Sequence, residues 1–130
     1  MPRYDIGDRA LWAYIAGFLD GEGCISIAAS SGYPSLQVTA NNTEEEPLLF
    51  IQKVFGGSIY WRRPTSVKCK DVYCWSIHGS SAIEVLEILL PFLIVKKERA
   101  LLAIEFGLTS SIEGKARIAA KLGILNKRGR

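Results

Sequence analysis

The chain has 130 residues, of which 48% are hydrophobic and 22% are charged, and its formal net charge is +3. This length and composition predict a single folded domain over residues 1–130 and argue against disorder. Apolar runs fall short of the roughly 20 residues of a membrane helix, and the first residues lack the apolar stretch of a secretory signal. We therefore expect an intracellular protein that is not secreted and has no membrane partner.

Charge is distributed unevenly along the chain. Residues 1–60 carry three basic and seven acidic side chains, whereas residues 61–130 carry thirteen basic and six acidic ones. A basic half suggests a polyanionic partner such as nucleic acid, although such a surface also serves solubility alone. Charge by itself leaves both interpretations open.

The first predicted element is a helix over about residues 8–21. Asp8 is a good N-cap, and Leu11, Ile15 and Leu19 recur at helical spacing. Two strands follow over about 25–30 and 36–41, because apolar and polar residues alternate there with period two.

A second helix and a second pair of strands are predicted next. A capping box over residues 43–46 predicts a helix that turns Leu49 and Phe50 inward and ends at Gly56. Strands are expected over 58–63 and 72–78, joined by a basic loop. Trp12, Trp61 and Trp75 are interpreted as packing residues rather than base-stacking ones.

The C-terminal part is predicted to be helical. Pro91 ends a helix capped by Ser80 or Ser81, and another helix spans about residues 95–106. A capping box at residues 110–113 predicts a last helix that runs towards Leu122. Residues 124–130 are expected to form a frayed basic tail.

This order of elements predicts an α+β fold with a four-stranded antiparallel sheet, helices on one face and an open second face. A polar open face with basic edges suits DNA, because a β-ribbon fits the major groove. For His78 a role as a nuclease base is the alternative. The residues expected to contact DNA are Ser26, Ala28, Ser30, Tyr33, Ser35, Gln37, Thr39, Arg62, Arg63, Lys68, Lys70, Ser76 and His78.

The stretch of residues 15–23, I-A-G-F-L-D-G-E-G, is unusual for the end of a structural helix. Gly17 lies inside the helix at a cost of about 1 kcal/mol relative to Ala, which is typical where another backbone approaches closely. Asp20 and Glu22 fall at the helix C-terminus, where the macrodipole disfavours anions by roughly 0.3–1 kcal/mol. A divalent cation held by carboxylates and free carbonyls would explain these acids. A glycine-rich helix end followed by exposed acids is the alternative.

These nine residues resemble the motif of the LAGLIDADG homing endonucleases, whose αββαββα core with a saddle-like sheet has the same order of elements. The sequence Pro91-Phe92-Leu93 followed by Lys96 and Lys97 is similar to a second block of that family. The resemblance implies an intron-encoded, site-specific double-strand DNA endonuclease in a prokaryotic cytoplasm or an organelle. It implies hydrolysis of phosphodiester bonds at a long pseudo-palindromic site, which leaves short 3′ overhangs. No small-molecule substrate is expected.

The resemblance also implies a homodimer and a metal. A chain with one motif forms a dimer in this family, so the motif helix is expected to pack on its copy through Ala13, Ala16, Gly17 and Asp20. Two Glu22 side chains would then meet over the minor groove, where Mg²⁺ would relieve their repulsion. Mn²⁺ is expected to substitute for Mg²⁺, and Ca²⁺ to bind without supporting cleavage.

By the same resemblance Glu22 takes the place of the acidic metal ligand, and the Gly21 carbonyl takes the place of the backbone ligand. Glu stands where Asp is commoner, which shifts the carboxylate oxygens by one methylene. Lys96 corresponds to the lysine near the scissile phosphate, with Lys97 as the alternative if the register slips by one.

A further family position, at the end of the second strand, holds a polar residue that orders solvent. A gapless reading places Ala40 there, so Asn41 is taken as the catalytic residue, with Asn42 as the alternative. The rival functions on the same fold are an intron RNA maturase and a DNA-binding regulator that does not cut. The combination of Glu22 with Lys96 favours the nuclease over both.

Overall fold

The computed structural model describes residues 8–28, 34–62 and 72–128. Five of the expected DNA contacts, Ser30, Tyr33, Arg63, Lys68 and Lys70, lie outside the described residues. The elements are α1 (Arg9–Glu22), β1 (Gly23–Ala28), β2 (Ser35–Asn42), α2 (Glu46–Phe55), β3 (Ser58–Arg62), β4 (Val72–His78), α3 (Gly79–Leu89), the 3-10 helix η2 (Leu90–Phe92), α4 (Lys97–Leu108) and α5 (Ile112–Arg128).

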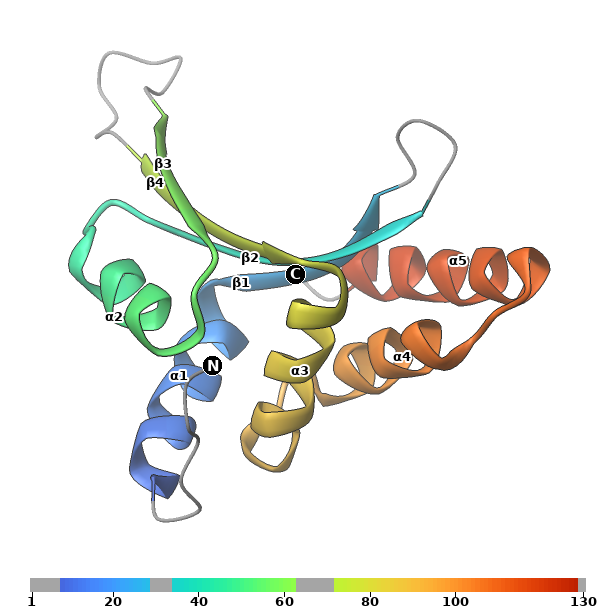
Figure 1. The fold of residues 1–130 in the computed structure, drawn as a ribbon, viewed down its shortest axis with the longest axis horizontal. Helices are drawn as coiled ribbons and strands as arrows, with labels where there is room; N and C mark the ends of the chain where they lie inside the picture. The colour runs from blue at the N-terminus through green and yellow to red at the C-terminus, as the bar shows by residue number, and fades with distance from the viewer. Residues whose placement is uncertain (1–7, 29–33, 63–71, 129–130) are drawn as a thin grey trace.

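The strands form an antiparallel sheet in the order β1-β2-β4-β3, which confirms the predicted α+β fold. The sheet is curved, and every described helix lies on its convex side (Figure 1). Alternation along β2 places Leu36, Val38 and Ala40 in the core, and the residues between them face the open side. The predicted facing of this strand is confirmed.

The core lies between the sheet and the helices beneath it. Trp75 is fully buried, and its indole Nε1 donates a hydrogen bond to the Gly56 carbonyl at 2.8 Å. The Trp12 ring stacks on Phe55 with centroids 5.6 Å apart. Trp12 and Trp75 pack in the core, as predicted, whereas Trp61 is 47% exposed on β3 and lies outside the core. The register places Trp61 on the same face of the sheet as Trp75, and not on the open face.

The phase of α2 differs from the prediction. Leu48 and Ile51 are buried, whereas Leu49 is 44% and Phe50 38% exposed. A run of consecutive apolar residues, 48–51, does not fix which side of the helix faces inward. The packing of α2 against the sheet, and of Phe55 against Trp12 of α1, decides it.

The start of α2 also differs, because the capping box at residues 43–46 does not form. The helix begins at Glu46 with Glu45 as its N-cap, and no described side chain caps it. The preceding turn is closed instead by Asn42, whose Oδ1 accepts the Glu44 amide at 2.8 Å. Asparagine competes well for such local bonds in turns.

The helix ends in the C-terminal half are shifted by a few residues. α3 begins at Gly79, where φ is +64°, so Ser80 and Ser81 lie inside the helix instead of capping it. The cap of α5 is Ser111, whose Oγ accepts the Gly114 amide at 3.0 Å, one residue later than predicted.

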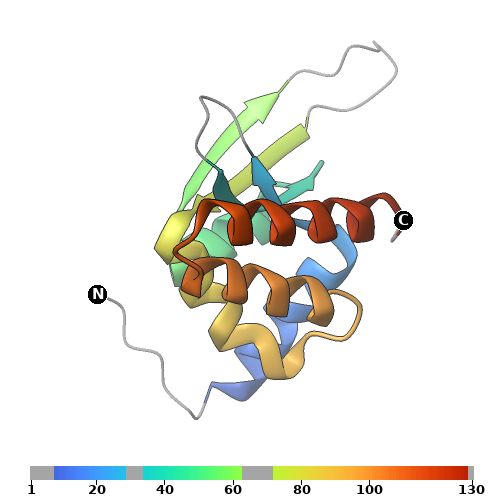
Figure 2. The same cartoon turned by 90° about the vertical axis from the view of Figure 1, so that its right-hand side faces the viewer.

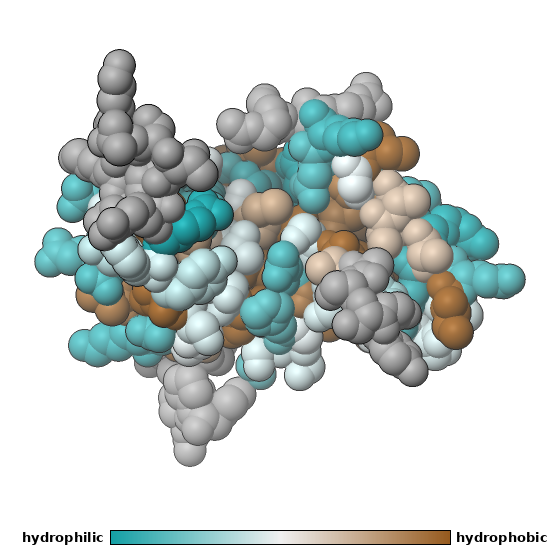
Figure 3. Space-filling model, turned by 90° about the horizontal axis from the view of Figure 1, so that it is seen from above, coloured by the Kyte–Doolittle hydropathy of each residue, from teal (hydrophilic) through white to brown (hydrophobic). Residues whose placement is uncertain are grey.

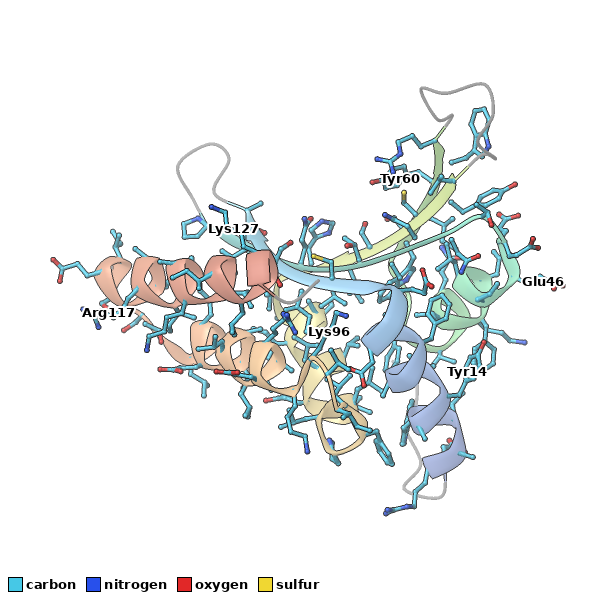
Figure 4. All side chains as sticks on the ribbon, turned by 180° about the vertical axis from the view of Figure 1, so that it is seen from behind. Tyr14, Glu46, Tyr60, Lys96, Arg117 and Lys127 are labelled. Atoms are coloured by element: carbon cyan, nitrogen blue, oxygen red, sulfur yellow. The ribbon has the colours of Figure 1, made fainter. Side chains whose placement is uncertain are left out.

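α5 is longer than predicted and reaches Arg128. The expected basic tail over residues 124–130 is therefore wrong for 124–128, which are helical. Arg117 lies near one end of α5 and Lys127 near the other (Figure 4). Figure 2 shows α5 alongside α4, and α5 also contacts β1. Within the described ranges, no helix has both the length and the apolarity to cross a membrane.

Candidate functional site

The junction between α1 and β1 depends on Gly23. A Cβ added there would lie 2.8 Å from the Leu19 carbonyl oxygen, so a side chain would force the backbone apart. The Gly23 amide instead closes the helix by donating to that same carbonyl. The chain therefore passes directly from helix to strand, and Glu22 is left exposed at the junction.

Asp20 ties the end of α1 to the start of α4. One carboxylate oxygen accepts the Ile94 amide at 2.8 Å, and the other accepts the Lys96 amide at 3.0 Å. Lys96 is the N-cap residue of α4, where an anion is favoured by the helix dipole. Asp20 thus has a role inside its own chain, and its expected position in the dimer interface stays a prediction.

Lys96 places a cation at the C-terminal end of α1. Its Nζ donates to the Asp20 main-chain carbonyl at 2.6 Å. A cation of the same chain therefore lies against the carbonyl end of α1, so the dipole argument alone does not require a metal. Lys97, the alternative to Lys96 as the lysine near the scissile phosphate, is exposed on the first turn of α4. It does not line the pocket at the junction of α1 and β1.

A pocket of about 440 Å³ opens at this junction. It brings together Glu22, Asn41 and Lys96, the three side chains predicted to be catalytic, from three separate elements. Figure 4 shows Lys96 beneath β1, between the ends of α1 and α5. The lining residues are Gly21, Glu22, Gly23, Cys24, Asn41, Lys96, Arg99 and Asn126.

The end of β2 is where a polar residue that orders solvent was expected, and the alternation of the strand decides which residue faces the pocket. Ala40 is buried on the core face, and its partner in the register is Gly23. Asn41 points to the open face and lines the pocket, whereas Asn42 bonds the Glu44 amide. Of the two asparagines considered, Asn41 is the one beside Glu22.

Arg99 and Asn126 are pocket residues that the sequence analysis missed. Arg99 is only 8% exposed although it carries a charge, and Asn126 was assigned to the frayed tail. A signal was available for Asn126, because Ile118, Leu122 and Leu125 continue the helical spacing up to it. For Arg99 the sequence offers none, since a polar residue in a helix normally faces solvent.

The small residues of α1 divide between two faces. Ala13, Gly17 and Gly21 are exposed, and within the described part of the chain no atom would lie within 4 Å of a Cβ added at Gly17 or Gly21. Ala16 is fully buried in the core of its own chain, so its prediction as a dimer contact is wrong. At 100° per residue it falls on the inward side with Ile15.

Next to this exposed stripe lie two apolar side chains of the turn that Asp20 holds. Ile94 is 83% exposed and Val95 is 59% exposed. On the other flank, Tyr14 is 52% exposed and meets the Phe50 ring edge-on at 5.6 Å. The exposed side of α1 is therefore an apolar surface with a flat, small-residue centre.

The expected DNA contacts within the described residues share the open face of the sheet. The register aligns Ser26, Gln37 and His78 in one row across three strands. Figure 3 looks onto this face, where polar and intermediate side chains gather along the middle. Ala28, Ser35, Thr39, Arg62 and Ser76 occupy the same face by alternation. Ser76 is only 8% exposed there, because it is covered by the neighbouring strands, so a direct contact of its side chain with DNA is not supported.

Hydrogen bonds connect the row of Ser26, Gln37 and His78. Gln37 Nε2 donates to Ser26 Oγ at 3.2 Å, and its Oε1 lies 3.2 Å from His78 Nε2. Since an amide oxygen only accepts, this hydrogen bond forms in the tautomer whose proton is on His78 Nε2. On β3 the hydrogen bond to the Cys74 thiol raises the pKa of Tyr60.

The donor atoms at the pocket suit a hard divalent cation that is shared with a substrate. Glu22 offers a carboxylate, Asn41 an amide oxygen and Gly21 a main-chain carbonyl. Among the described residues, no three His, Cys, Asp or Glu side chains gather as a metal site. Mg²⁺ commonly uses one or two carboxylates together with waters and substrate phosphates. The donor set of one chain fits that arrangement and not a closed protein site.

Comparison with known proteins gives consistent matches. Residues 15–103 match a family model described as LAGLIDADG endonuclease. The chain is 32% identical over 114 residues to the DNA endonuclease I-CvuI of Chlorella vulgaris, which covers 81% of this chain and 68% of that protein. The range that the family model matches, residues 15–103, contains Glu22, Asn41, Lys96 and Arg99, whereas Asn126 lies beyond it.

Solved structures agree. The homing endonuclease I-CvuI, in a crystal structure with its target and Ca, has a TM-score of 0.76 and 27% identity, covering 93% of this chain and 85% of that one. A second I-CvuI structure, with Mg and uncleaved DNA, has a TM-score of 0.71 at 25% identity over the same shares. The archaeal intron-encoded I-Vdi141I with DNA shares the fold, with a TM-score of 0.71 and 20% identity over 89% and 84%.

Proposed function

Because this chain belongs to the LAGLIDADG endonuclease family, we propose that it is a site-specific, homodimeric double-strand DNA homing endonuclease that requires Mg²⁺. The observation that carries the proposal is the pocket at the α1–β1 junction, which holds Glu22, Asn41 and Lys96 together. Its DNA substrate makes an intracellular place of action the natural one.

The need for a second copy follows from the pocket and from α1. Among the described residues that line the pocket, Glu22 is the one carboxylate. The exposed stripe of Ala13, Gly17 and Gly21 would let a second α1 approach closely, with Ile94 and Val95 covered at its edge. Two copies packed in this way would bring two Glu22 carboxylates to one axis.

The chemistry is divided among the pocket residues. Glu22 and the Gly21 carbonyl hold the divalent cation, and Asn41 orients the attacking water. When bound, Mg²⁺ polarises the phosphate and lowers the pKa of water. Lys96 stabilises the negative charge that develops on the scissile phosphate. Cleavage of both strands then leaves short 3′ overhangs, with Mn²⁺ active and Ca²⁺ inactive in place of Mg²⁺.

The binding mode follows from the open face. The row of Ser26, Gln37 and His78 and the residues beside it read base edges in the major groove. Two subunits read two half-sites, so the target is pseudo-palindromic. The basic segment of residues 63–71, which lies outside the described residues, belongs to the same proposal, because its lysines and arginine follow β3 in sequence.

The test begins without a known target. The purified protein selects duplexes from a randomised DNA pool in Ca²⁺, and the recovered sites are cloned into plasmids and incubated with Mg²⁺. We expect linear plasmid with 3′ overhangs at a pseudo-palindromic site, and no cleavage in the presence of a chelator. Sequence-specific binding without cleavage in any divalent metal would instead identify a regulator.

Two matched pairs of variants test the residues. Lys96→Met should abolish cleavage and preserve Ca²⁺-dependent binding, whereas Lys97→Met, its exposed neighbour, should cut normally. Glu22→Gln should lose cleavage by about 100-fold or more, since it removes a metal ligand, whereas Glu87→Gln on the exposed side of α3 should not. Normal cutting by the Glu22→Gln protein would rule out this active site.

A further inference from the structure

Arg99, a buried cation in the wall of the pocket, has no role in the proposed cleavage of DNA. The Arg99 guanidinium donates from Nε to Asn126 Oδ1 at 3.1 Å, from Nη1 to the Val95 carbonyl at 3.2 Å and from Nη2 to the Leu125 carbonyl at 3.0 Å. These three acceptors are neutral, and Arg99 is 8% exposed. Burying a charge is unfavourable, and an apolar residue of similar size often packs as well or better. Packing alone therefore does not account for an arginine here.

The hydrogen bonds of Arg99 continue to the strand that follows Glu22. Asn126 Nδ2 donates to the Ile25 carbonyl at 2.9 Å, while its Oδ1 accepts from Arg99. Val95 precedes Lys96, and Ile25 lies in β1, which begins directly after Glu22. One continuous path thus links the segment of Lys96 to the segment of Glu22 across the back of the pocket.

This path complements the bonds made by Asp20. Asp20 ties the turn of Ile94 and Lys96 to α1, on the near side of Glu22. Arg99 and Asn126 tie the same turn to β1, on the far side of Glu22. The junction that carries Glu22 is therefore held to the Lys96 turn from both directions.

From this geometry we infer that Arg99 and Asn126 are a positioning pair, which sets the spacing between Lys96 and Glu22 in the active pocket. The inference rests on the proposed nuclease function for its kinetic consequences. A misplacement of about 1 Å between catalytic groups can lower a rate by about 100-fold. The pair acts through the planar fork of Arg99, which binds three separated oxygens, and not through its charge alone.

The variants distinguish the effect of the planar, three-donor geometry of the Arg99 guanidinium from the effect of its positive charge. Arg99→Lys keeps the positive charge and loses the fork, and Asn126→Asp keeps an acceptor for Arg99 and loses the donor to Ile25. Asn126→Ala removes both bonds at the end of α5 with less disturbance of the core. Lys121→Gln, exposed on α5, is the matched control.

Three measurements are made on each full-length variant bound to DNA recovered from the randomised pool. They are the single-turnover cleavage rate in Mg²⁺, the DNA affinity in Ca²⁺ and the thermal midpoint. Hydrogen exchange of the amides over 23–26 and 94–96 is followed in the free protein. We expect cleavage to fall by about 10- to 100-fold for the three pair variants with affinity changed less than about 3-fold. Exchange should quicken in both segments, and the Lys121→Gln control should match the wild type.

The possible outcomes discriminate clearly. Normal cleavage and normal exchange in Arg99→Lys and Asn126→Ala would overturn the pair. Parallel losses of rate, affinity and thermal midpoint would also overturn it, because they indicate a general structural role. If the wild type binds but never cuts, the proposed nuclease function fails. Faster exchange confined to the two segments would still support the pair in that case.

Discussion

Asp20 shows how a residue of the motif stabilises its own chain. Its carboxylate accepts the amides of Ile94 and Lys96 and so holds the turn that leads into α4. Hydrogen bonds to a charged group are stronger than neutral ones. The acid therefore contributes to the stability of the chain and to the placement of Lys96 at the same time.

We predict that Asp20→Ala lowers the free energy of unfolding by about 1–3 kcal/mol, because two amides lose a charged acceptor. Urea unfolding followed by circular dichroism measures the change. Asp8→Ala is the control, since the Asp8 side chain makes no capping bond to the described helix and should change stability by less than about 0.5 kcal/mol. Equal effects of the two substitutions would contradict this account of Asp20.

At the scale of the elements, α1 has two apolar sides with different purposes. Trp12, Ile15, Ala16 and Leu19 face the core of the chain, and the stripe of Ala13, Gly17 and Gly21 faces outward. The absence of side chains at Gly17 and Gly21 is not required by any described part of the chain. A close partner on that side would explain it.

We predict that Gly17→Leu produces a folded monomer that no longer cuts, because the leucine side chain keeps a second α1 at a distance. Light scattering and analytical ultracentrifugation report the mass. The control is Gly123→Leu on α5, another helical glycine with open space around it, which should remain dimeric. A dimer that survives Gly17→Leu with full activity would place the interface elsewhere.

For the molecule as a whole, the curved sheet (Figure 1) presents a polar open face, and the pocket opens at the junction of α1 with the edge strand β1. The hydrogen bonds among Ser26, Gln37 and His78 join three strands across this face. They orient the Gln37 amide before DNA arrives, which reduces the entropy lost on binding. Base preference at one position should therefore depend on all three residues.

We predict that Gln37→Ala relaxes the preference at symmetric positions of the two half-sites, at a cost of about 1–3 kcal/mol per lost bidentate contact. Profiles of sites selected from a randomised pool measure the preference. Gln52→Ala, which removes a side chain bonded to the Gly57 carbonyl away from the open face, is the control and should leave the profile unchanged. An unaltered profile for Gln37→Ala would show that this row does not read bases.

Much of the architecture is encoded in local patterns, so the sequence alone determined it. Alternation along residues 36–41 established which side of that strand faces the core, because a strand has only two sides. The motif at residues 15–23 and the lysine after Pro91 carried the family resemblance. The site residues Glu22, Asn41 and Lys96 were named on this basis, and the structure brings all three to one pocket.

Only the tertiary structure decided the features that depend on contacts far apart in the chain. Asn126 is 101 residues from Ile25, and Arg99 is 27 residues from Asn126. No local period indicates such partners. The burial of Ala16 and the phase of α2 belong to the same class, since an apolar run can turn more than one side inward. The packing of one element on another settles which side is buried, and that information does not reside in any single segment.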